Sequence, residues 1–260
     1  VTVWDDSGAA HRSETAWFEM GLLNAGDWQA QWIGTPFCGG PRSTFPVPHL
    51  RKTFSLAGDV ASARLYITAL GVFDCSINGR PVGKDVFAPG WTDYNKRVQV
   101  LTYDVTQLVH RGENAIGALL GDGWAVGYVG WLNRQNYADR PQLLAQLEVA
   151  FTDGSTRMLV TDRSWTYHFG PITHSDFMTG EAYDARRAIA GWDTPAVSLP
   201  EAMPVATFPN TQRKLVALNG PTVRRINELV PVKEPLDRGG MGRKRHLFDL
   251  GQNMVGWVRF

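Results

Sequence analysis

The sequence predicts an all-β protein whose main domain is an antiparallel β-sandwich. Three observations lead to this prediction. Short runs of alternating apolar and polar residues recur along the chain, as in half-buried strands. Turn-forming residues are abundant, with 27 Gly and 15 Pro among 260 residues, and they separate these runs. The 3.6-residue period of an amphipathic helix is nearly absent.

The first 34 residues predict only part of a β-domain. Residues 1–4 alternate, residues 5–8 form a turn, and residues 16–20 have the pattern of a second strand. Because an isolated hairpin is marginal in water, these elements cannot make a stable unit alone. We therefore expect residues 1–34 to be the C-terminal part of a β-domain that starts outside this chain.

Residues 35–195 predict one whole sandwich. Asn78-Gly79 and Asp153-Gly154 are hairpin signals, because these residues tolerate positive φ. The weak helical pattern at residues 105–109 predicts a single helical turn. Strands are predicted at residues 50–56, 63–69, 72–77, 98–105, 115–120, 143–151 and 157–161.

The end of the chain predicts a linker and a second incomplete domain. Residues 196–214 contain Pro200, Pro204 and Pro209, and proline disfavours both helix and central strand. Residues 215–260 return to strand patterns and finish in an apolar run at residues 255–260. We expect 196–214 to be a proline-rich linker and 215–260 to be the start of a further β-sandwich domain.

Composition narrows the class of protein. Apolar residues make up 43%, and 26 Lys and Arg balance 25 Asp and Glu, for a net charge of +1. A near-neutral chain of this kind indicates neither a nucleic-acid nor a membrane partner. There is no apolar run of about 18 residues and no signal-peptide pattern at the start. We expect a soluble protein, with cytoplasm, periplasm and secretion all left open.

The loop after residues 115–120 has the chemistry of a sugar site. Gly121 and Gly123 flank Asp122 and precede Trp124, and glycine permits close approach of a ligand. A sugar ring can lie on an aromatic side chain while its hydroxyl groups bond to carboxylate, amide or guanidinium groups. The candidate sugar-binding residues are Asp122, Trp124, Tyr128, Trp131, Arg134 and Tyr137.

Structural interpretations of the same residues remain open. Trp124 could instead pack beneath the loop as a hydrophobic plug. A second group of candidate residues consists of Trp91, Asp93, Tyr94 and Arg97. For this group an ion pair between Asp93 and Arg97 is a simpler interpretation than a ligand site. Asp139 and Arg140 can be interpreted in the same way. The remaining tryptophans are expected in cores or interfaces, namely Trp4, Trp17, Trp28, Trp32, Trp165, Trp192 and Trp257.

Catalytic and metal sites are weakly indicated. A glycosidase needs two carboxyl groups at a defined separation, and sequence spacing cannot set that separation for the loop candidates Asp93, Asp122, Asp139, Asp176, Glu181 and Asp184. We assign no catalytic residue. The six histidines show no close spacing with Cys38 or Cys75, which disfavours zinc. Calcium, which takes only oxygen ligands, stays open as a cofactor, with its ligands unknown.

A connected set of motifs resembles bacterial α-L-rhamnosidases. The motifs follow the order of that family over nearly the whole chain. They are Asp27-Trp28-Gln29-Ala30-Gln31-Trp32-Ile33-Gly34, Pro89-Gly90-Trp91-Thr92-Asp93-Tyr94 with Arg97, Thr102-Tyr103-Asp104-Val105-Thr106, Gly121-Asp122-Gly123-Trp124, Asp139-Arg140-Pro141, Gly180-Glu181-Ala182-Tyr183-Asp184-Ala185-Arg186 and Asp249-Leu250-Gly251-Gln252-Asn253-Met254-Val255-Gly256-Trp257.

The resemblance implies the N-terminal, non-catalytic region of such an enzyme. It implies the tail of a fibronectin-like domain, a galactose-binding-like jelly roll, and the start of another β-domain. The family's general acid and base are glutamates in a helical barrel, and nothing in this chain matches that barrel. Some similar sugar-binding domains hold rhamnose through calcium. The implied partners are L-rhamnose or rhamnosylated glycosides and the remaining domains of the parent enzyme.

Three hypotheses about function follow. The chain is a carbohydrate-recognition and scaffold fragment of an enzyme that hydrolyses terminal α-L-rhamnose from glycosides. Alternatively, it is a purely structural β-domain that braces the catalytic barrel and binds no sugar. The third hypothesis is a self-sufficient glycosidase that uses loop carboxylates.

Overall fold

The computed structural model describes residues 1–16, 18–131, 133–210, 213–237 and 245–259. The chain forms two compact units, Val1–Val223 and Arg224–Phe260. Unit 1 contains a β-sandwich made of two large sheets, and this confirms the all-β prediction. No helix in the described part of the chain is long and apolar enough to cross a membrane.

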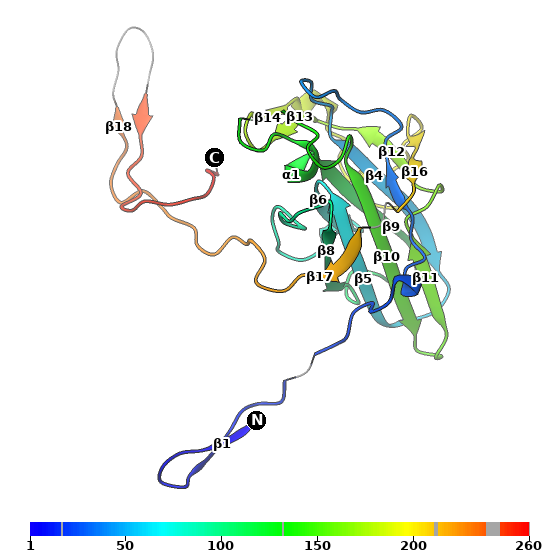
Figure 1. The fold of residues 1–260 in the computed structure, drawn as a ribbon, viewed down its shortest axis with the longest axis vertical. Coiled ribbons are helices and arrows are strands. Elements are labelled where there is room, and N and C mark those ends of the chain that lie inside the picture. Colours follow the sequence, from blue (N-terminus) through cyan, green and yellow to red (C-terminus); the bar gives the residue numbers. More distant parts are fainter. Residues whose placement is uncertain (17, 132, 211–212, 238–244, 260) are drawn as a thin grey trace. The chain divides into compact units, whose positions relative to one another are not determined.

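One layer of the sandwich is a seven-stranded sheet (Figure 1). Its central strand β10 pairs antiparallel with β5 along one edge and with β3 and β11 along the other. The last strand, β17, pairs parallel with β8. In spatial order the strands are β16 (Ala206–Phe208), β3 (Trp32–Gly34), β10 (Gln142–Phe151), β5 (Val60–Leu70), β8 (Arg97–Asp104) and β17 (Lys214–Ala217), with β11 (Thr156–Val160) beside β10.

The other layer is a six-stranded antiparallel sheet. Its long strands β4 and β9 pair over eight residues, from His49–Leu119 to Leu56–Gly112. The spatial order is β15 (Met203–Pro204), β12 (Thr166–Phe169), β4 (Pro48–Leu56), β9 (Gly112–Gly121), β6 (Val72–Ile77) and β7 (Arg80–Pro81).

The main core lies between the two sheets. Alternate residues of β10, Leu143, Ala145, Leu147 and Val149, belong to this core and are almost completely buried. Burial of each Leu or Val side chain among them stabilises the fold by roughly 1.5–3 kcal/mol. The two-residue period read from the sequence therefore selects which face of each strand points inward.

A second apolar cluster lies on the opposite side of the seven-stranded sheet. Leu70 and Leu144, which alternate with core residues of β5 and β10, pack here with Trp32 and Tyr94. Ala125 and Val126 of the short helix α1 (Gly123–Val126) complete the cluster. This packing fixes the chain directly after β9, where the candidate sugar-binding loop begins.

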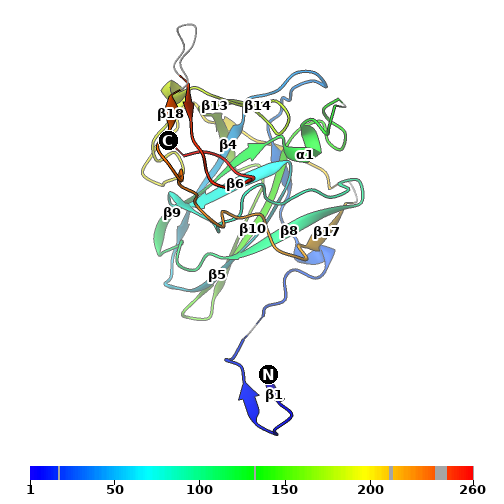
Figure 2. The ribbon, with the colours of Figure 1, turned by 90° about the vertical axis from the view of Figure 1, so that its left-hand side faces the viewer.

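The smaller elements are hairpins and single turns. The β13–β14 hairpin lies beside α1 (Figures 1 and 2). Unit 2 contains only one hairpin among its described residues, β18 with β19. The bounds are β1 (Thr2–Trp4), β2 (Ala10–Arg12), β13 (Ile172–Asp176), β14 (Gly180–Tyr183), β18 (Leu236–Asp237) and β19 (His246–Leu247), with 3-10 turns at Ala25–Asp27 and Ala185–Arg187.

The strands predicted for the main domain are confirmed, with shifts of up to three residues at their ends. Asn78 and Gly79 take φ values of 53° and 75° between β6 and β7, as the hairpin signal requires. Four strands at the end of the domain, β12 to β15, have no counterpart in the prediction. They are two to five residues long, too short to show a clear period.

Several local predictions differ from the structure. The described residues of 16–20 and 255–260 form no strand. Within 105–109 the predicted single turn is present, closed by the Leu108 N–H donating to the Val105 carbonyl, but no helix is formed. Residue 17 and residue 260 lie outside the described residues. The proline-rich stretch 196–214 is not wholly irregular, because β15 and β16 join the edges of the two sheets. Pro204 is tolerated there since an edge strand need not donate on its outer side. The division into four segments, 1–34, 35–195, 196–214 and 215–260, remains a prediction.

Candidate functional site

Asp122 and Arg134 form a buried ion pair. The Arg134 guanidinium donates to the Asp122 carboxylate, and its Nε lies 3.9 Å from Oδ2 of Asp176. The side chains of Arg134, Asp122 and Asp176 are 1%, 6% and 0% exposed. We call these three residues the buried ion cluster. Their side chains are turned away from solvent, so they organise the loops around them.

The buried ion cluster holds three loops together. Arg134 also donates to the carbonyl oxygens of Ser43 and Gly40, at the start of the domain. The Asp176 carboxylate accepts from the backbone N–H groups of Tyr128 at 2.9 Å and Met178 at 2.8 Å. The Arg134 contacts join segments 94 and 91 residues apart in sequence, and the Tyr128–Asp176 contact places the loop after α1 against the β13–β14 turn.

The buried ion cluster contains two carboxyl groups but only one guanidinium group. Burial raises the pKa of the Asp122 carboxyl to about 6; the Arg134 guanidinium opposes this rise, and the neighbouring Asp176 carboxylate adds to it. Two carboxylates share one guanidinium in a site without solvent screening. The Asp122 proton is therefore bound more tightly in the folded protein than in an unfolded chain.

Exposed aromatic rings gather next to the cluster. Trp91 and Trp124 are parallel within 3°, with ring centroids 6.3 Å apart, and Trp124 lies 4.2 Å from Phe177. Phe87 makes an edge contact with Phe177 at 5.2 Å. Trp91 is 52% exposed, Phe87 and Phe177 are partly exposed, and Trp124 is half-buried. We call these four rings the aromatic surface.

Phe87 is held in an unusual backbone conformation. Its φ of 58° lies in the left-handed region, which a bulky residue occupies only at a cost of about 1–2 kcal/mol. Such strain persists when surrounding structure imposes it, and it is concentrated at functional sites. Here the conformation places a phenyl ring against Phe177 at the rim of the aromatic surface.

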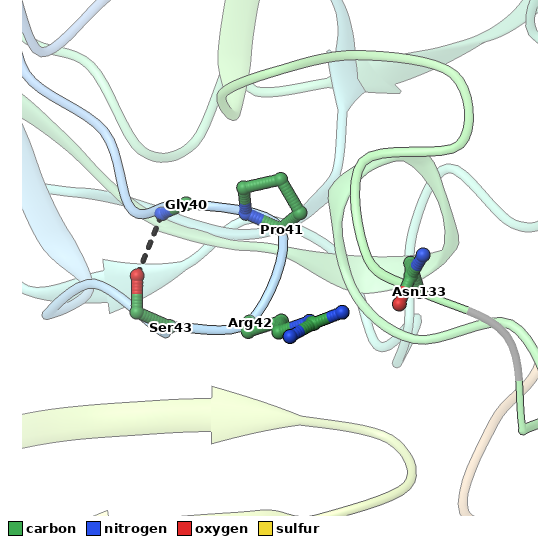
Figure 3. Close-up of a pocket in the computed structure, with 5 residues that line it drawn as sticks. All are labelled: Gly40, Pro41, Arg42, Ser43 and Asn133. Carbon is green, nitrogen blue, oxygen red and sulfur yellow. Dashed lines mark hydrogen bonds between the residues drawn. The ribbon is translucent and has the colours of Figure 1, made fainter.

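A shallow pocket of about 460 Å³ opens at the loop that Arg134 anchors. Figure 3 shows the Arg42 side chain extending from one wall toward Asn133 on the other. The lining residues are Gly40, Pro41, Arg42, Ser43 and Asn133.

The six predicted sugar-binding residues fall into three groups. Asp122 and Arg134 meet in the buried ion cluster. Trp124 joins the aromatic surface and also packs against the second apolar cluster, in agreement with the plug interpretation, while its role in sugar binding remains a prediction. The other three, Tyr128, Trp131 and Tyr137, do not converge on Trp124 through any recorded contact among the described residues. Their role in sugar binding remains a prediction.

The three remaining candidates differ in exposure. Trp131 is 98% exposed. Tyr128 is half-buried and donates its backbone N–H to Asp176. Tyr137 is half-buried with its ring 5.4 Å from Tyr94, and its carbonyl oxygen accepts from Arg213.

The expected Asp93–Arg97 ion pair is replaced by other contacts. The Asp93 carboxylate lies 3.4 Å from Lys96 Nζ, and Arg97 Nε donates to Thr92 at 2.8 Å. The Asp139–Arg140 ion pair does form, at 2.8 Å. The candidate binding residues predicted from the sequence did not include Phe87, Phe177 or Arg42. No local signal marks them, because their neighbours lie on distant loops.

The described residues offer little to a metal ion. They contain no group of three or more His, Cys, Asp or Glu side chains arranged to hold one. Asp122 and Asp176, the paired carboxylates in the candidate loops, already share Arg134. The calcium expectation therefore rests on the resemblance and stays a prediction.

A separate histidine cluster lies on the outer face of the six-stranded sheet. His49 of β4 and His168 of β12 are buried, with ring centroids 4.9 Å apart, and Trp192 lies 4.6 Å from His49. None of the four ring nitrogens has a hydrogen-bond partner among the described residues. Burial lowers the pKa of His49 to about 4, and it also lowers the pKa of His168.

Comparison with known proteins identifies the family. The sequence model of the family named α-L-rhamnosidase N-terminal domain matches residues 58–227 of this chain. An α-L-rhamnosidase of Formosa agariphila is 39% identical over 98% of this chain and 28% of its own length. One of Streptomyces avermitilis is 40% identical over 96% of this chain and 24% of its own.

Solved structures give the same result. A crystal structure of the Aspergillus terreus α-L-rhamnosidase superposes with a TM-score of 0.85 and 36% identity, over 92% of this chain and 28% of that one. The Streptomyces avermitilis enzyme complexed with L-rhamnose gives 0.70 and 41%, over 74% of this chain and 19% of that one. The chain thus spans about a quarter of the length of these relatives, and it belongs to the α-L-rhamnosidase N-terminal domain family.

Proposed function

We propose that this chain is the carbohydrate-recognition and scaffold region of an α-L-rhamnosidase that removes terminal α-L-rhamnose from glycosides. The aromatic surface is the observation that carries this proposal. Its rings offer flat apolar faces on which a sugar ring can stack. The crystal structure of the Streptomyces avermitilis relative is a complex with L-rhamnose, which supports the choice of sugar.

The buried ion cluster holds the segments that carry the proposed site. Asp122 precedes α1 and Trp124, while Asp176 precedes Phe177. By fixing both segments, the cluster preorganises the aromatic surface, which lowers the entropy lost on binding. In this proposal Asp122 and Arg134 position the loops, and Trp91, Trp124 and Phe177 contact the ligand.

Calorimetry tests the proposal directly. Titration with L-rhamnose, in calcium and in EDTA, is expected to give a Kd on the order of 0.1–1 mM. Replacing Trp91 by Ala is expected to weaken binding about tenfold or more. Trp4→Ala is the matched control, because Trp4 is also exposed but lies on β1. No heat at millimolar sugar, or an equal loss in both variants, would contradict the proposal.

Burial of Asp122 and Arg134 favours a second candidate, a β-domain that only braces the catalytic part. Complete absence of sugar binding in a correctly folded chain is the result that would support it. The self-sufficient glycosidase has less support, because Asp122 and Asp176 are buried and ion-paired. Incubation of the purified chain with a chromogenic α-L-rhamnoside is expected to release no product.

A further inference from the structure

The pocket beside Ser43 contains Arg42, a cation for which the described residues provide no carboxylate partner. Arg42 is exposed on the pocket wall, and it forms no ion pair within the described part of the chain. By contrast, the neighbouring Arg134 and Arg140 are both paired, with Asp122 and Asp139. Arg42 thus retains its full set of guanidinium donors for a ligand.

The loop that carries Arg42 is rigidly held. Arg134 donates to the carbonyls of Gly40 and Ser43, and the Gln135 amide donates to the carbonyl of Gly39 at 2.8 Å. A Cβ at Gly39 would lie 2.4 Å from the Ser43 carbonyl oxygen, so the turn requires glycine there. The backbone beneath Arg42 is therefore preorganised, and only the side chain must order on binding.

The opposite wall adds neutral hydrogen-bonding groups. The carbonyl oxygen of Asn133 accepts from the Asn136 amide at 2.6 Å, which leaves the Asn133 side chain to the pocket. The fully exposed Trp131 lies two residues before Asn133 in sequence. The pocket volume of about 460 Å³ is within the range of small-molecule sites.

We propose that this pocket binds the carboxylate of a uronic acid residue in an oligosaccharide. The guanidinium fork matches a planar carboxylate with two parallel hydrogen bonds, and the Asn133 amide suits the ring hydroxyl groups. This inference rests on the proposed carbohydrate-recognition function. It adds that the recognised glycan is acidic and that its charged sugar lies at Arg42, apart from the aromatic surface.

Calorimetric titration with D-glucuronate and with D-glucose tests the inference at low ionic strength. D-Glucuronate is expected to bind at least tenfold more tightly than D-glucose, and 0.5 M NaCl is expected to reduce this preference. Arg42→Gln is expected to abolish it. Arg111→Gln, which removes another exposed loop arginine, is the matched control and is expected to keep it. Equal binding of the two sugars, or unchanged glucuronate binding in Arg42→Gln, overturns the inference.

Two further arms separate this inference from its alternatives. Sodium sulfate that displaces glucuronate with equal affinity would show a general anion site and overturn the uronate assignment. L-Rhamnose binding is expected to be unchanged in Arg42→Gln, and glucuronate binding is expected to be unchanged in Trp91→Ala. If the unmodified chain prefers glucuronate but does not bind rhamnose, the aromatic surface is contradicted. If it binds rhamnose but shows no preference for glucuronate, the pocket is contradicted.

Discussion

The indole rings of Trp91 and Trp124 lie within 3° of parallel, with centroids 6.3 Å apart. Trp91 precedes β8 and Trp124 follows β9, so the pair joins two loops at one end of the sandwich. Only Trp124 also packs against the second apolar cluster, beside Ala125 and Val126. The two rings thus share a surface but differ in what they contribute to folding.

Separate alanine variants should resolve these contributions. Trp124→Ala is expected to destabilise the fold by about 2–3 kcal/mol, because it removes a half-buried aromatic from an apolar cluster. Trp91→Ala is expected to cost less than about 1 kcal/mol, because more than half of that side chain is already exposed. Urea denaturation followed by circular dichroism measures both values. Equal costs would show that Trp91 is also part of the packed structure.

Removing Arg134 should be far more costly than removing an exposed arginine. Arg134→Met leaves Asp122 and Asp176 buried without a counter-ion, and a loss of about 3–5 kcal/mol is expected. The matched variant is Arg186→Met, because Arg186 pairs with Asp184 at 2.7 Å but is 88% exposed. That variant is expected to lose less than about 1 kcal/mol. Similar losses in chemical denaturation would contradict the structural role of the buried ion cluster.

His49 should lower the stability of the fold in mild acid, whereas Asp122, whose pKa is raised to about 6, acts in the opposite direction. The pKa of His49 is lowered to about 4 in the folded protein, chiefly by burial and next by the neighbouring His168. An unfolded chain binds this proton at an ordinary pKa near 6.5, so it takes up more protons than the folded protein as pH falls from about 6.5 to about 4. The expected loss for His49 is about 2.5 kcal/mol by pH 4.5.

Other charges face the same histidines. Arg51 of β4 lowers the pKa of His168, and Asp193 acts on Arg51 from the segment that contains Trp192. Arg51 also donates to the carbonyls of Thr194 and Val197, so protonation adds positive charge beneath this segment. Denaturation at pH 7.5 and pH 4.5 should show that His49→Met loses less stability in acid than the original chain does. An equal loss in both proteins would contradict this prediction.

Replacing either of two glycines with positive φ by alanine should lower stability by very different amounts. Gly71 joins β5 to β6 at φ +142°, and a Cβ there would lie 2.3 Å from the Gly121 carbonyl oxygen. Gly154, in the hairpin between β10 and β11, has φ +84° with nothing within 4 Å. Gly154→Ala is expected to cost about 1 kcal/mol from backbone strain alone. Gly71→Ala adds a backbone clash and is expected to cost roughly 3 kcal/mol or more.

Thermal and urea denaturation measure both glycine variants. Because Gly71 and Gly121 lie where one sheet passes to the other, the clash would also displace the start of α1. Equal stability of Gly71→Ala and Gly154→Ala would contradict the close approach of these backbones.

Local sequence patterns determined much of the sandwich. The alternation in β4, β5, β9 and β10 selects the buried face of each strand, because neighbouring side chains point to opposite sides. Asn78-Gly79 determined a tight hairpin because both residues adopt positive φ. Short edge strands such as β15 and β16 escaped prediction, since their pairing with β12 and β3 supplies the stability that their own sequences lack.

The candidate site depended on tertiary structure instead. Sequence chemistry marked Asp122, Trp124 and Arg134 as one functional loop, but only folding brought Asp176 against Arg134 and Trp91 against Trp124. The physical reason is that burial and charge pairing act through space between segments far apart in sequence. The sequence by itself determined the strand faces, the turns and the residue types of the loop, while the tertiary structure decided which side chains are buried supports and which face the solvent.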